Sequence, residues 1–180
     1  SFTIDDMSRY IDLIKRAQQG ECILIDGATG TEVERRGVPQ LDNAWNGGGA
    51  LSHPKIVKQI HKDYIDSGAE IIISNTFATT KHALRDANQE HNFEVLNRRG
   101  VELAIQAREE LSNNSILVAG GISYWTWTGN KPSQKELTLS VTKQAQVMKD
   151  AGADLIMLEM MIDIEQMITT IEAAQSSGLS

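Results

Sequence analysis

Four short runs of apolar residues recur along the chain, and each follows a residue that suits the end of a helix. The runs are residues 22–25, 71–73, 116–119 and 155–158. They are continuous rather than alternating, which is typical of strands buried on both faces of a parallel sheet. Gly20, Gly68, Gly152 and the pair Asn113-Asn114 precede them, and such residues tolerate positive φ where a helix ends. The pattern predicts four parallel strands.

Amphipathic segments separate the runs and predict the helices. A leading helix covers about residues 7–18. After the first run, Ser52 is placed to cap a helix with Pro54 in its first turn and Tyr64 on its apolar face.

Three more helices follow the same logic. One covers about residues 93–111, with Gly100 weakening its middle. The next begins with a capping box formed by Ser133 and Glu136. The last covers about residues 163–171.

The alternation of strand and helix predicts an α/β fold built from four βα units with right-handed crossovers. A doubly wound sheet and a (β/α)8 TIM barrel both fit it, although no Gly-x-Gly-x-x-Gly follows any strand. Gly178 is a fifth helix stop, and Leu179 and Ser180 would begin a fifth strand. A complete barrel needs about 250 residues. The pattern alone leaves open a small four-stranded domain or the first half of a barrel.

Composition narrows the class of protein. The chain has 180 residues, of which 41% are hydrophobic and 23% charged, as in one globular domain. Its net charge is −7 and no run of Lys and Arg matches a phosphate backbone, so we expect no nucleic-acid partner. The apolar runs are too short to cross a membrane, and we expect no signal peptide. Cys22 is the one cysteine, so a cytoplasmic location is expected.

Polar residues follow the predicted strands, where parallel α/β folds gather reactive groups. Asp26 follows the first run, Asn75 and Thr76 the second, and Glu159 the fourth. Asp26 precedes a glycine, so a role in a turn is the structural alternative. Glu159 lies among apolar neighbours and is costly to bury without a partner, which favours a binding role.

These strand ends resemble a known family. The stretch Asp26-Gly27-Ala28-Thr29-Gly30-Thr31-Glu32 resembles the first-strand signature of the homocysteine S-methyltransferases. Residues 53–57, 60–64, 67–70 and 74–77 resemble the second unit of that family, and residues 151–159 its fourth. The ordered series implies that residues 1–180 are the N-terminal half of a (β/α)8 barrel, with its first four βα units and no second domain.

The resemblance implies methyl transfer to the thiol of homocysteine, which gives methionine. A zinc ion holds that thiol as the nucleophilic thiolate in this family. The zinc ligands of the family are cysteines on later strands, and Cys22, at the start of the first strand, cannot replace them. We therefore assign no metal ligand and no catalytic residue, and we expect no activity from the chain alone.

The resemblance carries over the amino-acid end of homocysteine. Glu159 matches the position that binds the substrate ammonium, and Asp26 and Gly27 match the first-strand residues of the same pocket. Asn75 and Thr76 are expected to line its floor.

The methyl donor of the family varies, and aromatic residues indicate an onium donor here. A cationic methyl group is attracted to aromatic faces. Trp45, Phe77 and Trp125 lie in predicted loops at the mouth and are the expected donor-binding residues. The structural alternative is that the tryptophans cover the rim or contact another subunit.

Two functional hypotheses remain. The chain is half of a methyltransferase, or it is an inactive half-barrel or binding module. In either case, residues 23–26 and 155–159 form unpaired sheet edges, which predict self-association or pairing with a completing second half. An aldolase-type barrel is a weaker alternative, because no predicted strand ends in the lysine that its Schiff base needs.

Overall fold

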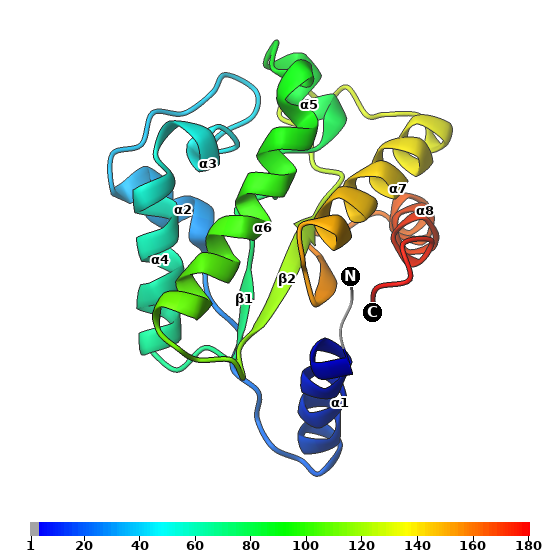
Figure 1. Cartoon of the computed structure of the whole chain (residues 1–180). Helices are drawn as coiled ribbons and strands as arrows, with labels where there is room; N and C mark the ends of the chain where they lie inside the picture. The colour runs from blue at the N-terminus through cyan, green and yellow to red at the C-terminus, as the bar shows by residue number, and fades with distance from the viewer. Residues whose placement is uncertain (1–3) are drawn as a thin grey trace.

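A small parallel sheet with helices along one side forms the framework of the protein (Figure 1). The computed structural model describes residues 4–180. Three strands pair in the order β1-β2-β3. They are β1 (Ile71–Ile73), β2 (Leu117–Ile122) and β3 (Leu155–Leu158). Three of the four predicted strands are therefore confirmed, and both strand pairs are parallel as expected.

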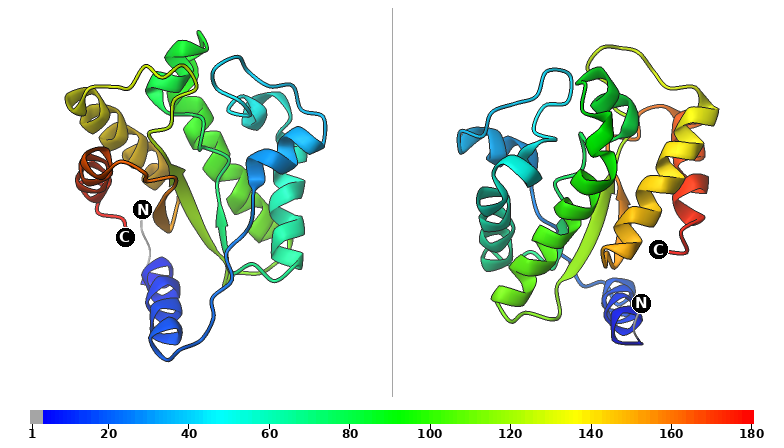
Figure 2. Two further views of the ribbon diagram at one scale, coloured as in Figure 1. Left: turned by 180° about the vertical axis from the view of Figure 1, so that it is seen from behind. Right: turned by 45° about the horizontal axis from the view of Figure 1, so that its top comes forward.

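Four helices lie on the outer side of the sheet; the first precedes β1, and the others follow β1, β2 and β3 in order. They are α4 (Pro54–Asp66), α6 (Phe93–Glu110), α7 (Gln134–Asp150) and α8 (Ile164–Gln175). In the view from behind (Figure 2, left), the strands face the viewer and α4, α6 and α7 lie behind them. A doubly wound sheet places helices on both faces and reverses its strand order. The described part of the chain is wound in one direction only.

The predicted first strand is the main correction. Residues 22–25 do not form a strand, and only one parallel bridge joins Ile25 to Ile71. Leu24 and Ile25 are 51% and 53% exposed rather than buried on both faces. This segment has a strand neighbour on one side only within the described residues, so nothing covers its other side and the ladder stays short.

The remaining helices are one before the sheet and several short ones in the connections. α1 (Ile4–Gln18) is the predicted leading helix. The pattern did not predict the others: α2 (Thr29–Arg35), α3 (Gly49–Ser52), α5 (Lys81–Asp86) and the 3-10 turn η1 (Glu90–Asn92). Ser52 is the last residue of α3, and His53 takes the N-cap position of α4, so the predicted Ser52 cap is wrong.

Other helix ends follow the sequence more closely. The capping box of Ser133 and Glu136 is confirmed at the start of α7. Gly68 and Gly152 have φ of 102° and 101°, in the left-handed region that glycine favours. Before β2 the left-handed residue is Ser112 (φ 53°) rather than either asparagine.

Apolar side chains fill the space on both faces of the sheet. On the outer face Ile72 and Val118 belong to one buried cluster with residues of α6 and α7. On the inner face Ile71, Leu117 and Leu155 cluster with Leu13 of α1. Helix α1 therefore packs against the residues that begin the three strands.

A buried ion pair ties these layers together. Asp154 accepts hydrogen bonds from Arg108 Nη1 at 2.8 Å and from the backbone N–H of Val118 at 2.7 Å. Arg9 of α1 donates to the same carboxylate at 3.3 Å. Asp154 thus joins α6, β2 and α1 just before β3 begins.

The far edge of the sheet has one further contact. The carbonyl of Ser180 accepts a hydrogen bond from Ile156 N at 2.8 Å. The segment predicted to begin a fifth strand therefore lies beside β3.

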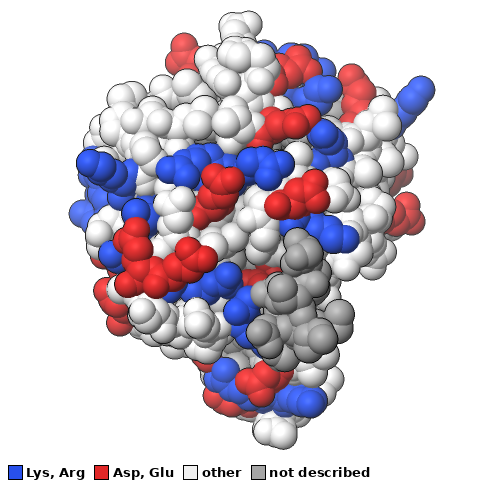
Figure 3. All heavy atoms as spheres, viewed as in Figure 1, with Lys and Arg blue, Asp and Glu red and all other residues white. Residues whose placement is uncertain are grey.

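The charged residues of the helical face are mixed in sign. Figure 3 shows Lys and Arg next to Asp and Glu over α4, α6 and α7. Ion pairs such as Lys62 with Glu110 and Lys143 with Glu94 join them. Among the helices of residues 4–180, none combines the length and the apolar character that crossing a membrane requires.

Candidate functional site

The polar residues after the strands meet at one end of the sheet, as parallel strands require. Asp26 N donates to Ile71 O, Ser74 N to Ala119 O and Glu159 N to Ile122 O, each at 2.9 Å. These bonds continue the ladder one residue past each strand, so the side chains that follow start from fixed positions.

A cavity of about 250 Å³ opens at this end of the sheet. Its walls come from the segment after the first apolar run, the loop before α3, and the ends of β1 and β3. The lining residues are Gly27, Ala28, Thr29, Gly30, Trp45, Asn46, Ile73, Ser74, Asn75, Phe77, Glu159 and Met160. Five expected site residues line it, namely Gly27, Trp45, Asn75, Phe77 and Glu159. The expected Asp26 directly precedes Gly27 but is not among the lining residues.

Two carboxylates lie at this end of the sheet: Asp26 is buried and Glu159 is half-buried, and each has one buried oxygen without a partner. Asp26 Oδ2 accepts from the N–H of Ile73 at 2.8 Å, while Oδ1 is buried and has no hydrogen-bond partner within residues 4–180. Glu159 Oε2 is in the same condition. Burial raises the pKa of Asp26 to about 7, against the opposing effect of the Ile73 N–H. Burial, and then the charge of Asp26, raise the pKa of Glu159 to about 7.

These carboxylates create a site for a cation with hydrogens to donate. Each has an unused acceptor, and a positive group placed between them would favour the charged form of both. A protonated amine meets both requirements.

Gly121 of β2 lies opposite Glu159 and, having no side chain, leaves space for the Glu159 carboxylate. A Cβ at Gly121 of β2 would lie 2.5 Å from Glu159 Oε2. Glycine at position 121 therefore leaves the carboxylate free to take its present place.

The expected donor residues are only partly brought together. Trp45 and Phe77 meet edge to face with ring centroids 6.4 Å apart, and Trp127 meets Phe77 at 6.0 Å. Trp125 does not line this cavity. Its carbonyl accepts a hydrogen bond from His82 Nε2 at 2.8 Å. Trp127, rather than Trp125, is the tryptophan of that loop which contacts the aromatic group.

Asn75 and Thr76 point to different surroundings. Asn75 lines the cavity and donates from Nδ2 to the carbonyl of Asn46 at 3.3 Å. Thr76 is fully buried, and its hydroxyl donates to Gly121 O at 2.7 Å. Its methyl group faces Gly100 of α6, so Thr76 supports the site from behind rather than lining it.

Two residues of the cavity wall have unusual backbone conformations. Trp45 has φ of 41° and Met160 has φ of 54°. Left-handed conformations cost side-chain-bearing residues on the order of 1–3 kcal/mol and are found most often at functional sites. The backbone of the cavity wall is therefore strained at two residues, and one of them, Met160, directly follows Glu159.

Sequence reasoning missed Asn46 and Gly30. A Cβ at Gly30 would lie 2.0 Å from Asn46 Nδ2, so these two residues pack directly against each other. The available signal was an amide beside a tryptophan at the start of the glycine run 47–49.

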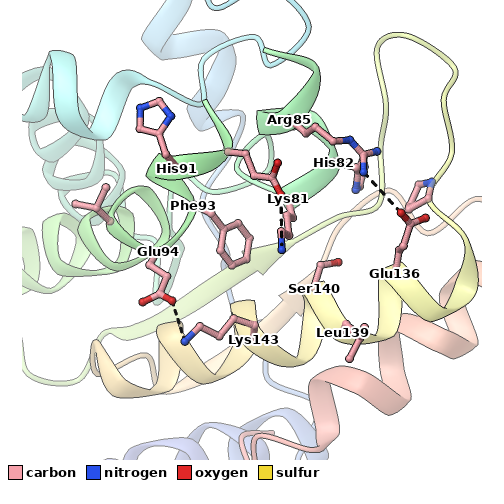
Figure 4. Close-up of a pocket in the computed structure, with 13 residues that line it drawn as sticks. Lys81, His82, Arg85, His91, Phe93, Glu94, Glu136, Leu139, Ser140 and Lys143 are labelled. Carbon is pink, nitrogen blue, oxygen red and sulfur yellow. Dashed lines mark ion pairs between the residues drawn. The ribbon is translucent and has the colours of Figure 1, made fainter. Parts of the chain in front are cut away.

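A larger cavity of about 940 Å³ lies on the outer side, between α5, the start of α6 and α7 (Figure 4). Its charged side chains are paired with one another, for example Lys81 with Glu90 and Arg85 with Glu136. It contains neither of the strand-end carboxylates. The smaller cavity is the candidate site, because unpartnered buried acceptors are found there.

The residues of this chain do not fit the zinc site that the resemblance implies. No group of three or more His, Cys, Asp or Glu side chains suited to a metal occurs within the described residues. Cys22 is exposed and begins the strand-like segment 22–25, whereas Asp26 follows the other end of that segment.

A parallel α/β fold wound in one direction, with a partly polar cavity where its strands end, is typical of the (β/α)8 barrel class. Within that class, the family model for homocysteine S-methyltransferase matches residues 23–179, and the chain belongs to this family.

Relatives of known function support the assignment. The chain is 29% identical over 170 residues to homocysteine S-methyltransferase 1 of Arabidopsis thaliana, covering 82% of this chain and 52% of that protein. It is 24% identical to betaine–homocysteine S-methyltransferase 1 of Sus scrofa, covering 97% of this chain and 63% of that protein. The chain therefore spans about half to under two thirds of the length of these relatives.

A solved structure agrees. The metallated form of the homocysteine methyltransferase MmuM from Escherichia coli superposes with a TM-score of 0.72 at 26% identity. The match covers 90% of this chain and 63% of that one.

Proposed function

We propose that this chain is half of a (β/α)8 barrel and supplies the amino-acid-binding half of a homocysteine methyltransferase site. One-way winding, the sequential strand order and the position of Ser180 beside β3 support the half-barrel. The two carboxylates with buried, unused acceptors carry the functional proposal. Asp26 and Glu159 bind the substrate ammonium, and Gly27 and Asn75 complete the pocket around it.

The methyl group comes from an onium-type donor in this proposal. Trp45 and Phe77 present aromatic surfaces at the cavity, and Trp127 extends them. A cationic methyl donor is attracted to such surfaces, by about 0.5–2 kcal/mol for each good contact. The acceptor is the homocysteine thiol and the product is methionine.

Thiol activation is not assigned to this chain. The described residues offer no zinc-binding set, so the zinc that the family uses would be held by other residues. The chain by itself is then a binding unit without catalytic activity.

A binding or assembly module is the second candidate, and one observation favours it. Ile162 in the loop after β3 and Ile164 at the start of α8 are 72% and 71% exposed. Exposed apolar side chains of this kind suit self-association or pairing with a completing half.

Binding of L-homocysteine to the purified chain tests the proposed function. In a titration followed by NMR, Glu159→Gln should weaken binding by about 10- to 100-fold, because a hydrogen bond to a charged group is lost. Glu109→Gln, the same change at an exposed position of α6, serves as the control.

Two outcomes would contradict the proposal. One is that wild-type protein does not bind homocysteine in the millimolar range. The other is that both variants bind as wild type does. Zinc analysis of the same sample should give far less than one ion per chain, and a ratio near one would show that the chain builds a metal site of its own.

A further inference from the structure

Asn46 is a buried amide whose two polar atoms are both unused. Asn46 is a residue of the cavity lining and is only 2% exposed. Neither Oδ1 nor Nδ2 has a hydrogen-bond partner within residues 4–180. Leaving such atoms unpaired is costly, and buried amides are normally bonded to protein, water or a ligand. The ammonium-binding role proposed above does not use this group.

The surroundings fix the amide where it is. Gly30 leaves the space that Nδ2 occupies, since any Cβ there would lie 2.0 Å away. Trp45, the residue before it, has the left-handed φ of 41°. The carbonyl of Asn46 accepts from Asn75 Nδ2 at 3.3 Å. Gly30, the strained Trp45 and the hydrogen bond from Asn75 thus hold Asn46 in a position that leaves its amide atoms unpaired.

The other groups of the cavity indicate which ligand atom this amide contacts. Glu159 in the cavity wall and Asp26, close enough for its charge to act on Glu159, offer acceptors, which suit an ammonium and repel a carboxylate. The side-chain N–H donors nearby are engaged, since Trp45 Nε1 donates to Glu34 and Asn75 Nδ2 to Asn46 O. Asn46 Nδ2 is the buried donor that remains unused.

An amino acid carries its ammonium and its carboxylate on one carbon atom. A ligand whose ammonium lies between Asp26 and Glu159 therefore brings an anion into an acidic cavity. That anion needs a donor to offset the repulsion. The amide supplies it from Nδ2, and its neighbouring Oδ1 accepts from the ammonium of the same ligand.

We propose that Asn46 binds the α-carboxylate of the amino-acid substrate and makes the site selective for intact amino acids over their decarboxylated amines. The inference rests on the proposed function, because it assumes that homocysteine is the ligand. Asn46 is a specificity-determining residue in this view.

Paired titrations test it. The 180-residue chain is titrated with L-homocysteine and with homocysteamine, its decarboxylated analogue, which keeps the same amine and thiol. Wild type should bind homocysteine at least about 10-fold more tightly. Asn46→Asp keeps the shape of the side chain but loses the donor. It should weaken homocysteine binding by about 10- to 100-fold and leave homocysteamine binding unchanged or tighter.

The controls separate the possible failures. Asn130→Ala removes an exposed amide from a loop and should change neither affinity. Asn46→Ala gives a second, uncharged variant should Asn46→Asp fail to fold. If wild type binds both ligands equally, or the Asn46 variants weaken both equally, the inference is overturned and the proposed function stands. If wild type binds neither ligand, both are overturned.

Discussion

At the scale of single residues, the site is a pair of acids that the fold keeps away from water. Asp26 and Glu159 each have a pKa near 7 because burial disfavours their charged forms. Their ordinary values are 3.8 and 4.5. Between those values and about 7 the folded chain holds protons that the unfolded chain has released, so stability falls as pH rises through this window.

This sign gives a prediction for the empty protein. Glu159→Gln removes one of the two groups, so its stability relative to wild type should be greater at about pH 8 than at about pH 5. Urea unfolding of both proteins at the two pH values measures the difference. The comparison must be between variants, because His61 acts in the opposite direction. Burial lowers the pKa of His61 to about 4, so its contribution to stability is lost as pH falls from about 6.5 to about 4. An equal difference at both pH values would contradict the assigned shift of Glu159.

At the scale of elements, helix α6 approaches the end of β1 so closely that its middle has no room for a side chain. A Cβ at Gly100 would lie 2.6 Å from Thr76 Cγ2. From the sequence, this glycine looks like a defect in a helix. In the structure, Gly100 lets α6 pack against Thr76, which lies behind the cavity.

A double-mutant cycle tests this contact. Gly100→Ala gains about 1 kcal/mol of helix propensity, yet we expect a net loss of about 1–3 kcal/mol because Thr76 is overpacked. Thr76→Ser removes the methyl group and keeps the hydroxyl that bonds to Gly121. Combined with Thr76→Ser, Gly100→Ala should cost much less, as measured by urea unfolding. Additive effects of the two changes would show that the contact does not matter.

Much of the fold could be predicted from elements of this kind, because apolar runs and glycine stops are local signals. Three strands and the capping box at Ser133 follow directly from them. The segment at Leu24 and Ile25 reads like a buried strand, but its exposure depends on which neighbours pair with it, and the segment itself does not contain that information.

The candidate site could be predicted only in part. Asp26 and Glu159 directly follow apolar runs, so their position could be read from the sequence. Which of the neighbouring residues Asn75 and Thr76 faces the cavity could not, because β1 ends at Ile73 and no regular pattern fixes the direction of the side chains after it. Asn46 is brought to the cavity by an irregular loop, for which periodicity gives no guide.

At the scale of the whole molecule, the two lateral edges of the sheet differ from the rest of the surface. Leu24 and Ile25 are exposed in the segment beside β1, and Ile162, Ile164 and Ile168 are exposed in the loop after β3 and on α8. Large apolar side chains gathered at a sheet edge favour pairing with another chain.

We therefore predict that the isolated chain forms dimers or larger species at tens of micromolar. Ile164→Lys should shift the population toward monomer, because it places a charge on the associating surface. Leu139→Lys is the matched control, since Leu139 is 64% exposed but lies on α7 beside the outer cavity. Light scattering gives the masses. A wild-type chain that is monomeric at these concentrations would contradict the prediction.

The strained backbone at Trp45 and Met160 has a consequence for the response of this protein to selection. Glycine at either position would relieve the left-handed conformation, and an apolar residue at 46 would remove two unpaired polar atoms. Each change is expected to stabilise the fold while removing a feature of the cavity. A screen for heat resistance alone would therefore select changes in the candidate site before changes in the helices. The most stable variants would then be those with the weakest ligand binding.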